Sequence, residues 1–144
     1  MLDLKSADVK RFWRAAEAHR DAARLILDGC LEAVSSTPAH DAVYLSGYVV
    51  ECGLKALLLS RIPARKRPQM LRELKDVLGH DLERLKKRLL QTGLDFPSER
   101  VPDFTLVRRA WSSEMRYKVL RWRRPDAESV YVAASNLFSW IGGG

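Results

Sequence analysis

The chain has 144 residues, of which 47% are hydrophobic and 30% charged, with a formal net charge of +7. This balance is typical of one soluble globular domain with a real core. The N-terminal residues lack the apolar segment of a signal peptide, and no apolar run approaches the ~18 to 20 residues of a membrane span. We therefore expect a soluble cytoplasmic protein, with one domain over residues 1–141 and a flexible glycine tail over 142–144.

The positive charge is unevenly distributed along the sequence. Residues 1–60 carry seven Lys or Arg against eight Asp or Glu, whereas residues 61–144 carry 18 against 10. Such an asymmetry is consistent either with an anionic partner, nucleic acid being the usual one, or with a cationic surface that only contacts solvent.

The two cysteines, Cys30 and Cys52, lie in expected helices with no CxxC pair and no cluster of His and Cys. Buried, reduced thiols are expected from this pattern rather than a disulfide or a metal site. The sequence gives no sign of a cofactor.

Apolar residues recur at helical spacing through most of the chain. A first helix is expected from the N-cap Ser6 to about residue 34, and a second from Pro38 to about Ile62. Further helices are expected over residues 69–78, 82–91, 104–115 and 127–141, with loops over 63–68, 93–103 and 116–126. No strand is expected. The pattern predicts an all-α fold, an antiparallel four-helix up-and-down bundle with one or two extra short helices.

The helix from Asp41 to Arg61 is apolar almost all the way round, which is typical of a helix at the centre of a bundle. One polar stripe interrupts it, since Tyr44, Tyr48, Glu51 and Lys55 are spaced to lie on one face. Buried charges are costly unless they are paired, so the stripe is paired, solvated or functional. Glu51 and Lys55 have the favourable i, i+4 order and can satisfy each other. The small residues Ser46, Gly47 and Gly53 indicate close approach by a neighbouring segment, within the bundle or across a dimer.

Three fragments occur in a characteristic order: GYVVECGLKALL at 47–58, GHDL at 79–82 and MRYKV at 115–119, the last preceded by Trp111. Together they resemble the HEPN domain, a prokaryotic all-α family often encoded beside minimal nucleotidyltransferases. The resemblance covers nearly the whole chain. It implies a helical bundle that usually dimerises and, in many members, a metal-independent ribonuclease. The ribonuclease motif is an Arg, a polar or aromatic residue, four to six further residues and then a His.

Arg116 and Tyr117 match the start of that motif, but no histidine follows His80 anywhere in the chain. The general acid or base that RNA cleavage would use is therefore missing from its expected position. Arg14 and His19 match the spacing in letters only, because residues five apart on a helix point about 140° apart. His80 is the first candidate for a substitute base, and the alternative for it is a turn residue that bonds the backbone.

The resemblance suggests two interpretations of the polar stripe. It forms either a structural network or one wall of an anion-binding pocket, in which Arg116 with Lys55 would hold a phosphate and an acid would orient Arg116. The residues expected around such a pocket are Tyr48, Glu51, Lys55, His80, Asp81, Arg116 and Tyr117.

Two basic segments are candidates for nucleic-acid contact. The first contains Arg65, Lys66 and Arg67. The second, Arg121, Trp122, Arg123 and Arg124, alternates cations with an aromatic ring, which suits contact with an RNA backbone together with base stacking. Solvated loops are the alternative for both.

Three functions remain open from the sequence. The first is a HEPN-like module of a toxin–antitoxin or defence system that lacks the standard ribonuclease site and binds RNA, a nucleotide or a minimal nucleotidyltransferase antitoxin. The resemblance implies that this module is a homodimer. The second is an active metal-independent ribonuclease that uses Arg116, Tyr117 and His80. The third is a structural interaction domain.

Overall fold

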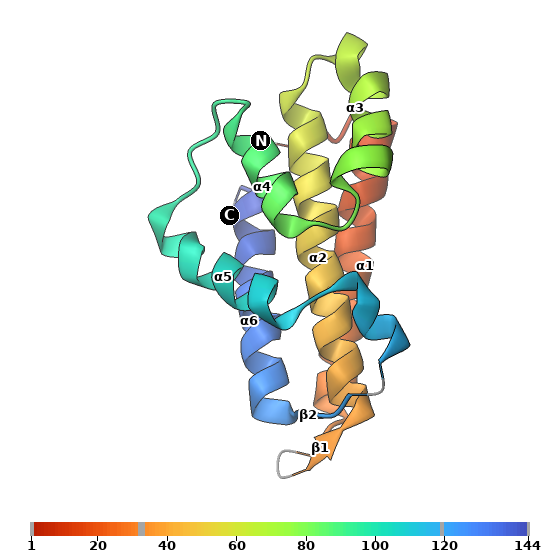
Figure 1. The fold of residues 1–144 in the computed structure, drawn as a ribbon, viewed down its shortest axis with the longest axis vertical. Helices are drawn as coiled ribbons and strands as arrows, with labels where there is room; N and C mark the ends of the chain where they lie inside the picture. The colour runs from red at the N-terminus through yellow and green to blue at the C-terminus, as the bar shows by residue number, and fades with distance from the viewer. Residues whose placement is uncertain (1, 32–33, 119, 144) are drawn as a thin grey trace.

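The computed structural model describes residues 2–31, 34–118 and 120–143, except for the side chain of Arg116. The described chain is all-α, as the sequence predicts (Figure 1). Its helices are α1 (Ala7–Asp28), α2 (Thr37–Arg61), α3 (Arg67–Glu73), α4 (Leu82–Leu90), α5 (Val101–Ala110) and α6 (Arg124–Ile141). Single helical turns lie at Ala64–Lys66, Leu74–Leu78, Ser98–Arg100 and Ser113–Tyr117.

The core consists of three long helices rather than the four principal helices that were expected. α2 has 25 residues, α1 has 22 and α6 has 18, and α2 packs against both of the others. The short helices α4 and α5 pack on α2 and α6 and complete the domain (Figure 1). A regular four-helix bundle is therefore not confirmed, because the next longest of the described helices, α4 and α5, have only nine and ten residues.

The central helix α2 begins and ends where its sequence dictates. The Ser36 hydroxyl accepts a hydrogen bond from the Ala39 amide at 3.2 Å, Pro38 lies in the first turn, and Pro63 follows the helix. Contrary to the expectation from the sequence, α2 is long and apolar enough to cross a membrane, with a mean hydropathy of 1.5 over its best window. Since 83% of that window is buried inside the protein, the helix has the burial of a core helix in a soluble protein.

Both glycines of α2 allow close packing by side chains of the same chain. A Cβ on Gly47 would lie 2.0 Å from ring carbons of Trp111, and one on Gly53 would lie 3.0 Å from Ile141. The close approach that these small residues predict thus occurs within the domain.

Several boundaries differ from the sequence prediction. α1 ends at Asp28, six residues early, because the Gly29 amide bonds back to Ile26 and closes the helix. The prediction of a loop up to residue 103 is wrong, since α5 begins at Val101 with a proline in its first turn, where no amide donor is needed. α6 also begins early, at Arg124.

Two short strands were not expected. β1 (Ser35–Ser36) pairs antiparallel with β2 (Trp122–Arg123), and Ser36 lies opposite Trp122. Two residues per strand are too few to produce a recognisable alternation. The ladder ties the start of α2 to the start of α6.

Candidate functional site

A buried carboxylate joins two basic side chains near the middle of the molecule. Glu51 Oε1 accepts a hydrogen bond from His80 Nδ1 at 2.6 Å, and Glu51 Oε2 accepts one from Lys55 Nζ at 3.4 Å. The Glu51 and Lys55 side chains are only 4% and 10% exposed, whereas the His80 side chain is 50% exposed. In the tautomer with its proton on Nδ1, the ring donates to the carboxylate, and Nε2 is the acceptor of a ring that reaches solvent.

A tight turn between α3 and α4 brings His80 to this position. Gly79 has a φ of +50°, a conformation that strongly favours glycine, and its amide bonds to the Leu74 carbonyl at 2.8 Å. The next residue after the histidine, Asp81, caps α4 by accepting a bond from the Arg84 amide at 3.1 Å. Asp81 was predicted as an anion-site residue, and here its carboxylate stabilises the helix start.

Aromatic rings pack beside the acid. The Tyr44 hydroxyl donates to the Tyr48 hydroxyl at 3.2 Å, and the Tyr48 ring packs edge-on to Trp111, with centroids 5.2 Å apart, and to His80, at 6.0 Å. The His19 ring lies 5.6 Å from Tyr48. Burial lowers the pKa of His19, although the negative charge of Glu51 partly opposes the shift. His19 is therefore a neutral packing residue of this cluster at neutral pH.

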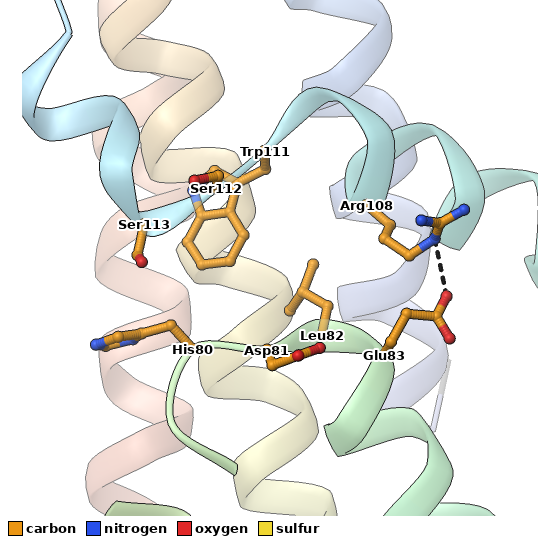
Figure 2. A pocket seen from close by; sticks show the side chains of 8 residues that line it. All are labelled: His80, Asp81, Leu82, Glu83, Arg108, Trp111, Ser112 and Ser113. Carbon is orange, nitrogen blue, oxygen red and sulfur yellow. Dashed lines mark ion pairs between the residues drawn. The ribbon is translucent and has the colours of Figure 1, made fainter. Parts of the chain in front are cut away.

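Two cavities meet at His80. The first, of about 470 Å³, is bounded by the α4 start and by the segment after α5. Figure 2 shows His80 at one side of it and the Arg108–Glu83 ion pair, with a separation of 2.8 Å, at the other. The second, of about 570 Å³, lies between α1, α2 and the α3 region and is lined by Asp8, Arg11, Phe12, Lys55, Leu71, Arg72, Leu74, Lys75, Gly79 and His80. We call this second cavity the basic pocket.

The chemistry available at the site is acid–base and electrostatic. Cys52 neighbours Glu51 in sequence, but burial raises the pKa of its thiol to about 12, so it is not a nucleophile at neutral pH. Among the described residues, no group of three or more His, Cys, Asp or Glu side chains could hold a metal ion.

The Arg116–Tyr117 pair lies in the turn Ser113–Tyr117. The side chain of Arg116 is outside the described part of the structure, so its predicted contact with an acid stays a prediction. Tyr117 is 76% exposed. Met115, which precedes Arg116, accepts a hydrogen bond on its carbonyl from His40 Nε2 at 3.1 Å. This bond fixes the turn near the start of α2, roughly 16 Å along the helix from Glu51.

The two basic segments lie at opposite ends of α2, about 37 Å apart, and do not form one surface. In the first segment Arg65 and Lys66 are exposed, but Arg67 donates to the carbonyls of Leu59 and Ile62 and is only 14% exposed. Arg67 thereby caps α2.

In the second segment two of the three arginines also bond the backbone. Arg121 donates twice to the Ser35 carbonyl, at 3.2 and 2.7 Å, and Arg124 donates to the Leu27 carbonyl at 3.0 Å. Arg123 is exposed, whereas Trp122 is half-buried against the core. The alternation of cations with an aromatic ring suggested RNA contact, but Arg121 and Arg124 bond the backbone and stabilise the fold.

The basic pocket contains three cations that the sequence did not single out, namely Arg11, Arg72 and Lys75. They come from α1, α3 and the turn Leu74–Leu78. Their sequence neighbourhoods are ordinary amphipathic patterns, so only the tertiary packing reveals that they converge.

No family model, curated protein or solved structure matches this chain.

Proposed function

We propose that the chain is a HEPN-like module of a prokaryotic toxin–antitoxin or defence system that binds phosphate groups of nucleic acid at the basic pocket beside His80. The observation that carries the proposal is the convergence of Arg11, Lys55, Arg72 and Lys75 on one cavity that opens at an exposed histidine. Cationic side chains around a concave surface attract phosphate and increase the rate of its association. The motifs at 47–58, 79–82 and 115–119 support the family, and with it a homodimer and a nucleotidyltransferase partner.

Salt-dependent binding of a labelled single-stranded RNA tests this proposal. The affinity should fall steeply between about 50 and about 200 mM salt, because binding phosphates releases counterions. Arg72→Ala and Lys75→Ala should each weaken binding several-fold, since both side chains are exposed and their loss should leave the fold intact. Arg109→Ala, an exposed cation on α5 outside the pocket, is the matched control and should bind like the wild type. Equal losses in all three variants would mean diffuse attraction and would contradict the proposal.

A second candidate is metal-independent ribonuclease activity, favoured by the Glu51–His80 hydrogen bond of 2.6 Å. A carboxylate that holds one ring nitrogen orients the other as a general base. His80 Nε2 would take the proton of a ribose 2′-hydroxyl, whose oxygen attacks the adjacent phosphorus. The 5′-oxygen would leave with a proton from solvent, giving a 2′,3′-cyclic phosphate and a 5′-hydroxyl end.

Incubation of RNA with the protein in EDTA tests the second candidate. Cleavage should depend on His80, on Glu51 and on Arg116, so His80→Gln, Glu51→Gln and Arg116→Ala should each abolish it. RNA methylated on the 2′-oxygens should stay intact, because it lacks the nucleophile. Binding without any cleavage would leave the module non-catalytic.

A further inference from the structure

The basic pocket has the volume of a site for one small ligand. Its lining comes from α1, α2 and the segment from α3 to Gly79, and its volume is about 570 Å³. A volume of this order accommodates one small ligand.

The charge around the cavity exceeds what a phosphodiester requires. Four cations, Arg11, Lys55, Arg72 and Lys75, stand against Asp8 at the rim and Glu51 behind Lys55, which leaves a net charge of about +2. Arg11 and Asp8 are 3.8 Å apart and largely exposed, so their pairing is weak. Among the described residues, Arg72 and Lys75 make no ion pair. A phosphate monoester carries close to −2 at neutral pH and a diester carries −1.

The lining of the pocket combines apolar side chains with cations. Phe12 and Leu71 are part-exposed, and two cations lie over the Phe12 ring, with Arg11 Cζ 5.2 Å and Lys55 Nζ 5.8 Å from the ring centroid. Glu51 takes only one of the three ammonium donors of Lys55. A ligand that carries both a base and an anionic group matches this combination of apolar and cationic side chains.

We propose that the basic pocket recognises a phosphate monoester attached to a nucleoside, and discriminates against internal phosphodiesters. The monoester is either the terminal phosphate of an RNA chain or a free nucleoside monophosphate. This inference rests on the proposed function, since it names the chemical class of the anion that the pocket binds.

Three oligonucleotides of one sequence test the inference, with a 5′-phosphate, a 5′-hydroxyl or a 5′-phosphate capped as its methyl ester. The methyl ester keeps the shape of the phosphate and removes one negative charge. The 5′-phosphate oligonucleotide should bind at least about tenfold more tightly than the other two at neutral pH. Binding of three further ligands identifies the source of the monoester. These ligands are a 3′-phosphate oligonucleotide, a nucleoside monophosphate and the bare nucleoside.

The variants separate this inference from the proposed function. Arg72→Ala with Lys75→Ala should remove the preference for the monoester, while Arg109→Ala should keep it. RNA binding that is lost in Arg72→Ala and Lys75→Ala but shows no preference for any phosphate end would overturn the inference and leave the proposed function standing. Binding of a nucleoside monophosphate without any RNA binding would support the inference and overturn the proposed function.

Discussion

Two places along helix α2 contain buried polar groups, and they differ in the partners that these groups bond. Toward its middle, Glu51 is bonded by two basic side chains, and one of them, His80, reaches solvent between two cavities. Toward its start, His40 is bonded to the Met115 carbonyl, and Trp111 Nε1 donates to the Tyr44 carbonyl at 2.9 Å. The first place pairs a carboxylate with basic groups and opens to solvent, whereas the second bonds backbone carbonyls and leaves the buried Nδ1 of His40 without a partner among the described residues.

The difference separates a charged, solvent-facing arrangement from one that bonds the backbone on the same helix. In the second place, the Trp111 donor and one nitrogen of His40 are satisfied by backbone carbonyls, and these bonds hold residues 111–117 on α2. A buried carboxylate that holds an exposed histidine costs desolvation energy, and its bonds orient a group toward solvent. The Glu51 region is therefore the one expected to bind, and the Trp111 region the one expected to hold residues 111–117 on α2.

The largest effect is expected from removing the charge partner in the open region. Glu51→Ala would leave the nearly buried Lys55 ammonium without its carboxylate, and we expect a loss of about 3–5 kcal/mol in the free energy of unfolding by urea. The double variant Glu51→Ala, Lys55→Met should recover part of this loss, because it removes the unpaired charge.

The matched control for that prediction is Glu73→Ala. It breaks the Arg88–Glu73 pair, in which the side chains are 27% and 32% exposed, and should cost less than about 1 kcal/mol. If the two substitutions cost the same, Glu51 is not held in a low-dielectric environment, and the contrast between the two regions of α2 disappears.

A smaller loss is expected from crowding the Trp111 region. Gly47→Ala would place a Cβ 2.0 Å from Trp111 ring carbons, so the ring must move and its bond to Tyr44 must lengthen or break. We expect about 1–3 kcal/mol of destabilisation, with a change in tryptophan fluorescence.

Gly29→Ala serves as the control for Gly47→Ala. Its Cβ would have nothing nearer than 3.6 Å, and its φ of −87° suits any residue. Unfolding should change by less than about 0.5 kcal/mol. An equally stable Gly47→Ala variant would show that Trp111 is not packed on the helix backbone.

The fold was predictable where local chemistry decides it. The apolar run of α2, its proline-marked ends and the i, i+4 pair of Glu51 and Lys55 all follow from neighbours in sequence. The end of α1 was missed because apolar residues keep their helical spacing beyond Gly29, and the closing hydrogen bonds there cannot be seen in that spacing. The β1–β2 ladder was missed because its strands have two residues each.

The site was predictable only in part, because the spacing of residues in the sequence does not show tertiary contacts. Glu51 and Lys55 stood out as charges on an apolar helix, and the resemblance to the HEPN domain placed His80 near them. Arg11, Arg72 and Lys75 could not be found, because an exposed cation on an amphipathic helix looks the same whether or not it faces a cavity. The role of Arg67 as a cap was likewise hidden, since a basic loop predicts solvent or nucleic acid before it predicts a backbone partner.

The smallest expected effect is a pH dependence that His19 contributes to the open region. Burial lowers its pKa, so the unfolded chain binds a proton more readily than the folded protein near the ordinary pKa of about 6.5. The stabilisation is therefore complete above that pH and is lost as the pH falls through it toward the lower folded pKa. Urea unfolding between about pH 8 and about pH 5.5 should show a decline in stability that is shallower in His19→Gln. His40 and His80 are present in both proteins, so the difference between the two profiles belongs to His19. Parallel profiles would mean that the ring is hydrated in the folded state and that the open region extends past Tyr48 to α1.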